Sequence, residues 1–116
     1  MPYVLDNGTA TLNGATVKAN GTALLANGGT NNITVNGGTV SGTNNVFNSV
    51  AGVNTLKAEN GAVLNGTMAV AAGTSNVSLN NATWNNNGNS TVTTLNNAGT
   101  VAFTAPTTPA AGNYKN

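Results

Sequence analysis

An internal repeat limits the possible folds of this chain more than any other feature. Steps of 23, 23 and 21 separate the members of a first apolar series, Leu12, Val35, Ala58 and Leu79. The second series has the same steps and consists of Val17, Val40, Val63 and Trp84. The third, with steps of 23 and 23, consists of Leu24, Phe47 and Val70. Three apolar marks that advance together indicate one structural unit copied along an axis, which is the sequence signature of a solenoid.

Each copy consists of short segments in which apolar and polar residues alternate. In the first copy, Ala10 and Leu12 alternate with threonines, and the pair Asn13-Gly14 follows. A second alternating segment ends at Asn20-Gly21. Alternation over four to six residues predicts a strand with one buried face, and Asn-Gly supplies the positive φ angles that a sharp corner needs. Three strands and three corners in one repeat predict a triangular coil.

Aligning the copies fixes which side chains point outward. One column is polar in all four coils and reads Thr11, Thr34, Lys57 and Ser78. The column before it is apolar throughout and reads Ala10, Ile33, Leu56 and Val77. Like residues recur at one step when each strand pairs in parallel with its own copy, about 4.8 Å away. We therefore predict an all-β fold, a single-stranded parallel β-helix, with ladders of corner asparagines along its axis. Sandwich strands need no fixed step, and no apolar pattern of helical period persists.

The two ends of the array depart from the repeat. Residues 1–8 are predicted to form an opening strand that breaks at Asn7-Gly8. The motif Leu-Asn-Asn-Ala at Leu79 recurs at Leu95, well short of a full repeat, which predicts a last coil, about 85–104, without its third strand. Its inward side chains are expected to be Val92, Leu95, Val101 and Phe103, with Trp84 and Phe103 filling the core. We thus expect about five coils over residues 1–104, and a Pro/Thr/Ala linker or truncated tail over residues 105–116. Open end coils would expose strand edges that invite other chains.

Composition excludes several kinds of partner. Asn, Gly and Thr fill half of the chain, and only 4% of its residues are charged, against roughly a quarter in ordinary domains. A net charge of +1 gives neither the basic surface of a nucleic-acid binder nor a polybasic lipid patch. No apolar run approaches the roughly 20 residues of a membrane-spanning helix, and no signal peptide is apparent. We therefore expect no nucleic-acid partner and no direct membrane insertion by this segment.

The residues of enzymatic and metal sites are nearly absent. The chain has no His and no Cys, and its two acidic residues, Asp6 and Glu59, are far apart in the sequence. Paired-carboxylate hydrolysis needs two acids within roughly 5 to 9.5 Å, and calcium-binding β-rolls need an Asp in every repeat. Lys18 and Ser41 are expected to stack on an outward column, which does not make a catalytic pair. We expect no enzymatic activity, no cofactor, and no catalytic, cofactor-binding or metal-ligating residues.

A threonine- and asparagine-rich face is the alternative functional feature. Thr9 and Thr11 form the Thr-x-Thr pattern with which flat β-solenoid faces bind ice. Their counterparts are Asn32 with Thr34, then Thr55 with Lys57, so that the pattern is interrupted by the third coil. A small module that binds carbohydrate or ice through this face stays open as the second hypothesis. Curli-like amyloid repeats of similar length use glutamine ladders, and glutamine is absent here.

Several stretches resemble the passengers of bacterial autotransporters. Thr9–Val17 and Thr34–Val40 look like passenger coils, and Trp84–Phe103 is similar to the last coils of pertactin-like passengers. The resemblance implies a right-handed parallel β-helix, carried outside the Gram-negative outer membrane by a C-terminal β-barrel that would follow further coils. It also implies a secreted or cell-surface location and a structural, adhesive role, with host or bacterial surface glycans or proteins as partners. No protease motif of that family matches.

Overall fold

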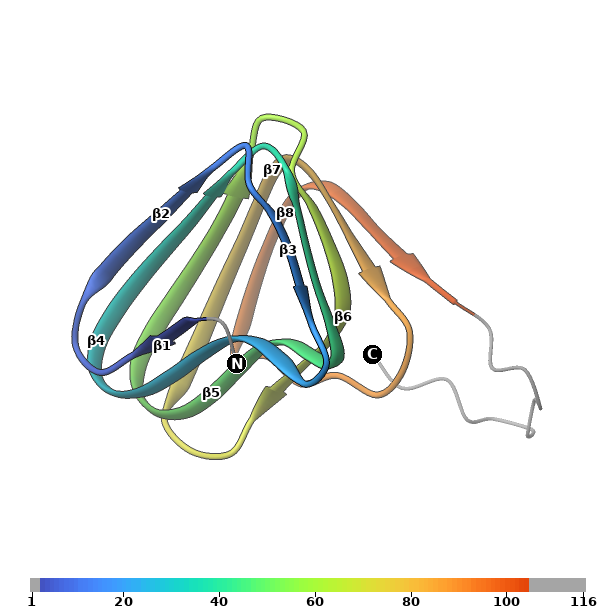
Figure 1. Ribbon diagram of the computed structural model, residues 1–116. Helices are drawn as coiled ribbons and strands as arrows, with labels where there is room; N and C mark the ends of the chain where they lie inside the picture. Colours follow the sequence, from blue (N-terminus) through green and yellow to red (C-terminus); the bar gives the residue numbers. More distant parts are fainter. Residues whose placement is uncertain (1–2, 105–116) are drawn as a thin grey trace, which may run out of the picture.

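The computed structural model describes residues 3–104, which form strands and turns and contain no helix. Eight strands follow one another along the chain: β1 (Tyr3–Leu5), β2 (Thr9–Asn13), β3 (Thr16–Ala19), β4 (Thr22–Asn36), β5 (Thr39–Glu59), β6 (Val63–Val70), β7 (Thr74–Asn86) and β8 (Thr94–Phe103). Figure 1 shows that they wind into a three-sided coil. β4, β5 and β7 are long because the chain stays extended around some corners, so that one strand covers parts of two or three sides.

Every strand pairing is parallel, and the strands form one sheet that is wound on itself. Seen from the N-terminal end, the chain turns clockwise as it recedes in Figure 1, which makes the solenoid right-handed. This is the hand that parallel crossover connections adopt almost always. The predicted parallel β-helix is confirmed. It has about four turns, not five, because β1 and β8 form only parts of further turns.

We count turns from β2 and number the three sides of each turn in chain order: in the first turn β2 forms the first side, β3 the second, and the start of β4 (22–26) the third. The first side has the predicted register. Leu12 pairs with Val35, Val35 with Ala58, and Ala58 with Leu79, while the polar column from Thr11 to Ser78 lies one residue away. These apolar side chains point to the axis, where they form the core with the inward residues of the other two sides. Burying each aliphatic side chain contributes about 1.5–3 kcal/mol, so the stacked columns are the main source of stability.

The second series is wrong in the third turn. Val40 pairs with Leu64, and Leu64 pairs with Trp84, whereas Val63 pairs with Thr39 and Thr83 on the outer face. Leu64 is fully buried and Val63 only partly. The cause is one extra residue at the preceding corner. Three residues (60–62) separate Glu59 from Val63 there, and two (37–38) occupy the equivalent corner one turn earlier.

The third series is wrong in the same turn, by two positions. Leu24 pairs with Phe47 as predicted, but Phe47 pairs with Met68, and Val70 pairs with Ser49. In the second turn the corner between Ser41 and Phe47 contains extra residues, which give two register shifts against the next strand. The third turn crosses the same corner with fewer residues. Met68 is buried, while Val70 is only partly covered.

The repeated Leu-Asn-Asn-Ala motif does not set the register of the last turn. Leu95 pairs with Val77, and Leu79 pairs with Asn97, so the step on this side is two positions longer than the spacing of the motif. In the turn before the last one, residues 87–93 cross the third side without forming a strand, held by bonds from Thr91 N to Met68 O (2.9 Å) and from Thr93 N to Ser75 O (2.8 Å). On the second side Val101 pairs with Trp84, as predicted.

Side-chain ladders run along the corners, as the asparagine pattern predicts. On the outside, Asn36 donates to Asn13 Oδ1 at 3.0 Å, and Asn60 donates to Asn36 Oδ1 at 2.5 Å. On the second side, Asn65 donates to Ser41 Oγ (3.0 Å), and Asn85 donates to Asn65 Oδ1 (2.8 Å). Each bond joins neighbouring turns, so the polar surface reinforces the stacking of the backbone.

A second kind of ladder is buried inside a corner. Asn31 Oδ1 accepts hydrogen bonds from Asn7 N (2.8 Å) and Gly8 N (2.9 Å) of the turn before. Its Nδ2 donates to Gly28 O (2.9 Å) and to Asn54 Oδ1 (2.8 Å) of the turn after. Asn31 is fully buried. One amide therefore satisfies groups from three successive turns.

Replacing Asn31 by alanine is expected to cost about 3 kcal/mol of unfolding free energy, because each buried polar group left without a partner costs about 1–3 kcal/mol. Asn36→Ala is the matched control, since Asn36 occupies an exposed ladder, and it is expected to cost less than about 1 kcal/mol. Urea unfolding followed by circular dichroism measures both. Equal losses would show that the buried ladder has no special role.

Candidate functional surfaces

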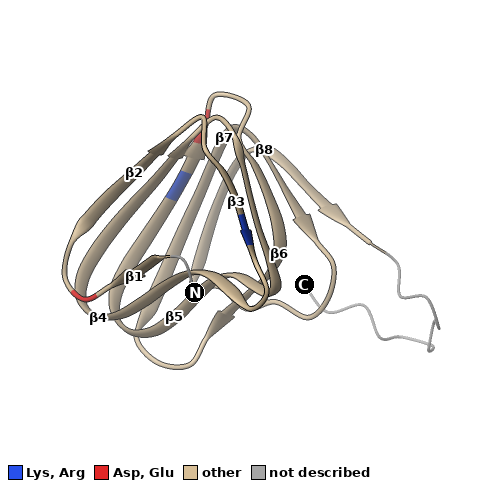
Figure 2. Cartoon of the chain, in the orientation of Figure 1, with Lys and Arg blue, Asp and Glu red and all other residues tan. Residues whose placement is uncertain are grey.

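Charged side chains are few and spread over the solenoid. Figure 2 shows the two acidic positions at different corners of the triangle, so that Asp6 and Glu59 do not form a carboxylate pair. Lys57 Nζ lies 3.2 Å from Glu59 Oε1, and the two side chains are 53% and 25% exposed. A surface ion pair of this kind contributes little, about 0–1 kcal/mol. Lys18 pairs in register with Ser41 on the outer face, as expected.

The described residues 3–104 contain no group of three His, Cys, Asp or Glu side chains that could hold a metal ion. Within the same residues no helix is long and apolar enough to cross a membrane. The sequence offers no site residue to place, so the candidate sites are surfaces: the polar first side and the two ends of the solenoid.

The polar first side carries two outward columns in the predicted register. Thr9, Asn32, Thr55 and Asn76 form one column, and Thr11, Thr34, Lys57 and Ser78 form the other. Hydroxyl and amide groups alternate along the first column, which suits a hydrogen-bonding partner. The second column is interrupted by the lysine and its ion pair, so a regular Thr-x-Thr array is present only on the first turn.

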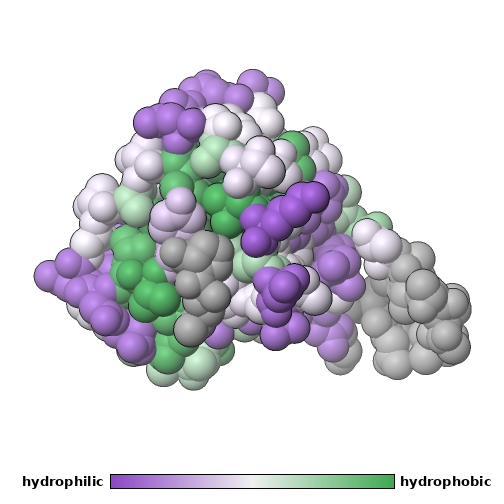
Figure 3. Space-filling view, viewed as in Figure 1, coloured by the Kyte–Doolittle hydropathy of each residue, from purple (hydrophilic) through white to green (hydrophobic). Residues whose placement is uncertain are grey.

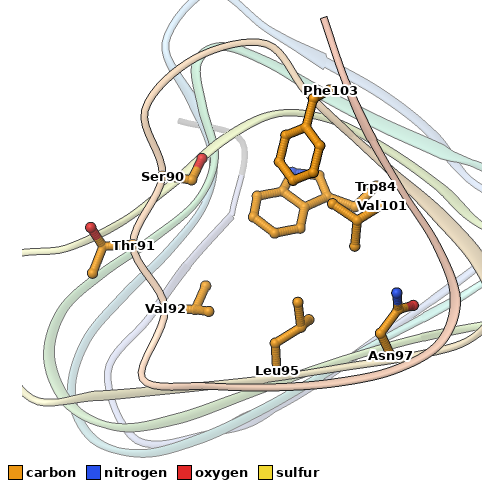
Figure 4. A pocket seen from close by; sticks show the side chains of 8 residues that line it. All are labelled: Trp84, Ser90, Thr91, Val92, Leu95, Asn97, Val101 and Phe103. Carbon is orange, nitrogen blue, oxygen red and sulfur yellow. The ribbon is translucent and has the colours of Figure 1, made fainter. Parts of the chain in front are cut away.

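A hollow of about 510 Å³ lies at the C-terminal end of the solenoid. Its lining consists of Trp84, Ser90, Thr91, Val92, Leu95, Asn97, Val101 and Phe103. Figure 4 shows the apolar members pointing into the ring that the last turn makes. The four predicted inward residues, Val92, Leu95, Val101 and Phe103, do face the axis, but the space between them is not filled.

The floor of the hollow is fixed by hydrogen bonds. Trp84 is 4% exposed, and its Nε1 donates to Gly66 O at 2.8 Å. Ser90 Oγ donates to Asn86 Oδ1 (2.8 Å) and accepts from Met68 N (3.0 Å). The indole and the segment around Ser90 are therefore held in place by the turn beneath them, so the hollow has a defined shape.

The rim of the hollow is open to solvent. Leu95 is 40% exposed and Phe103 is 50% exposed, although both occupy inward positions. At the N-terminal end of the solenoid, opposite the hollow, Tyr3 and Val4 of β1 are 37% and 50% exposed. Figure 3, which faces the N-terminal end, shows apolar groups surrounded by polar corners. The C-terminal hollow is not visible in the sequence, because the hollow exists only where the last turn leaves its third side uncovered.

Together these features define the class of the protein, a right-handed parallel β-solenoid with a polar outer surface and two apolar ends. Comparison with known protein families, curated proteins and solved structures gave no significant match.

Proposed function

We propose that this chain is a non-enzymatic structural scaffold, a solenoid stalk of a secreted or surface-exposed passenger of the autotransporter type in a Gram-negative bacterium. The observation that carries the proposal is the unbroken stacking of outward polar columns on inward apolar columns along the first side. Such stacking makes a regular scaffold in which each turn is held by its neighbours. The resemblance of residues 84–103 to pertactin-like passengers adds the cell-surface location.

The polar first side is the part of the stalk that would contact partners. It presents hydroxyl and amide groups from successive turns, and these groups suit hydrogen bonding to surface glycans or to exposed protein backbone of a host or bacterial cell. Adhesion or cell contact is accordingly the role that we propose for the displayed stalk.

Surface display tests this proposal. The full chain is placed between a signal peptide and an autotransporter β-barrel, and its exposure is followed by antibody labelling and protease digestion of intact cells. We expect the chain to be displayed as a protease-resistant rod, and a Leu64→Asp variant to be displayed poorly or digested. Digestion of the wild-type chain at the rate of the variant would contradict the scaffold role. Sequencing the gene on both sides tests whether further coils and barrel strands follow.

A second candidate function is a small binding module for carbohydrate. The alternating hydroxyl and amide column from Thr9 to Asn76 favours it. Glycan-array binding by the isolated chain, reduced by replacing Asn32 or Asn76 with alanine, would support this function. Ice binding would appear as thermal hysteresis of the same sample.

A further inference from the structure

The two ends of the solenoid hold most of its exposed apolar side chains. Five large hydrophobic residues are exposed among those described, and four of them lie at the ends: Tyr3 and Val4 at one, Leu95 and Phe103 at the other. All of the residues of β8 are uncharged. Natural sheet edges are usually protected by charge, by proline or by a covering segment. Within residues 3–104 β8 has no such protection, and the N-terminal edge strands carry only the charge of Lys18 in β3 and of Asp6 beside β1.

The incomplete turns at the two ends are complementary in outline. β8 forms the first and second sides of a last turn, where it pairs with β7 only, and no described residue forms the third side. β1 forms only a third side, and it pairs with β4 of the turn that follows it. A β8 from one copy and a β1 from another therefore add up to one complete turn.

We propose that two copies of this chain stack head to tail, with β1 of one copy filling the C-terminal hollow of the other. The bond from Thr91 N to Met68 O places Ser90 in the column of Tyr3, Leu24, Phe47 and Met68. In the stack, Tyr3 of the second copy then lies next to Ser90, and Leu5 lies next to Val92. The largest side chain of β1 thus meets the smallest side chain of the hollow's floor.

Side-chain sizes also match on the other two sides of the junction. Continuing the observed columns by one turn brings Leu95 next to Ala10 and Phe103 next to Ala19 of the second copy. Each large, exposed residue of β8 therefore meets a small one of β2 or β3. Val101 meets Val17, which repeats the pairing of Val17 with Val40 inside the molecule.

The backbone allows this junction in one direction. Parallel pairing requires the free edge of β8 to meet the free edges of β2 and β3 with all strands running the same way, as they do within the solenoid. The interface is heterologous and does not close, so further copies add to the same axis. The chain after Thr104 is the other segment that could occupy the hollow. Its sequence suits this role less well than β1, because Pro106 and Pro109 lack the N–H groups that a ladder strand donates.

Disulfide crosslinking between introduced cysteines tests the junction. The chain has no cysteine of its own, so every disulfide must form between the introduced positions. In the stack, Thr94 of one copy lies beside Thr9 of the next, about 4.8 Å away. Within one copy the two are four ladder steps apart, about 19 Å, which is beyond the reach of a disulfide. We expect a mixture of Thr9→Cys and Thr94→Cys proteins to give disulfide-linked heterodimers under mild oxidation, at least 10-fold more than the mismatched mixture of Thr9→Cys and Thr100→Cys.

Sedimentation velocity gives a second readout on proteins without cysteine. The wild-type chain is expected to associate as its concentration rises, and Leu95→Lys is expected to weaken this association at least 10-fold. Asn96→Lys is the matched control, since it adds the same charge to the same strand but on the outer face, and it is expected to leave the association unchanged.

A monomer at every concentration, or equal crosslinking of matched and mismatched pairs, would overturn head-to-tail stacking. A further outcome would also overturn it: the full chain is monomeric, and removing residues 105–116 makes it associate. The tail of the same chain would then be the occupant of the hollow. The inference rests on the proposed scaffold role and gives the stalk a means of extension. Further coils encoded in frame after Thr104 would fill the hollow from the same chain and would overturn the stacking. The two can fail separately, since a strictly monomeric chain that is displayed as a protease-resistant rod would keep the scaffold role and lose the stacking.

Discussion

Replacing Leu64 by aspartate is expected to abolish folding, whereas the same change at the neighbouring Val63 leaves a folded protein. Leu64 is fully buried between Val40 of one turn and Trp84 of the next. The change removes about 1.5–3 kcal/mol of apolar burial and puts a carboxyl group into a site without a polar partner, which costs several kcal/mol more. Their sum approaches the roughly 5–15 kcal/mol that stabilises a whole domain. Far-UV circular dichroism and urea unfolding give the readout.

Val63 is the control because it differs from Leu64 by one position and by the face of the strand. It lies in an outward column with Thr39 and Thr83, where a polar side chain already occurs in both neighbouring turns. Val63→Asp is expected to cost about 1 kcal/mol, mainly through strand propensity and partial burial. An uninterrupted repeat step predicts the reverse, with Val63 inward. Unfolding of Val63→Asp together with tolerance of Leu64→Asp would therefore show that the register described for this turn is wrong.

These two residues also show how far the sequence alone could lead. Alternation predicts the first side in all four turns, because polar Thr11, Thr34, Lys57 and Ser78 lie between apolar columns. On the second side of the third turn both candidates are apolar, so alternation cannot choose between them. The choice depends on how many residues the preceding corner uses, which is two (37–38) in the second turn and three (60–62) in the third, and both corners contain Asn or Gly.

The buried amide and the open hollow were not predictable for a different reason. An asparagine at a corner is expected outside, and Asn31 is inside because backbone groups of Asn7, Gly8 and Gly28 converge on it from two turns. The hollow lies where no described residue forms the third side of the last turn, next to residues 87–93, which cross that side in the turn before without forming a strand. Both features arise from contacts between turns, and a repeat pattern specifies only which turn a residue belongs to.

Replacing Gly73 by alanine is expected to cost about 3 kcal/mol or more of unfolding free energy, and replacing Gly61 by alanine about 1–2 kcal/mol. Both residues have a left-handed backbone, with φ of 79° and 81°, so the conformational cost is shared. They differ in space: a Cβ on Gly73 would lie 2.2 Å from Gly52 O, and a Cβ on Gly61 would have no atom within 4 Å.

The obstacle at Gly73 is backbone of the neighbouring turn, which no side-chain movement can relieve. A methyl group there must push two turns apart and stretch the ladder of parallel hydrogen bonds between them. Gly52 is under the same constraint, since its Cβ would lie 2.4 Å from Gly29 O, so the corner requires glycine in three successive turns. Thermal and urea unfolding of the two variants measure the difference. Equal losses at Gly73 and Gly61 would mean that the corner can open without cost and that the turns are held together by the apolar columns alone.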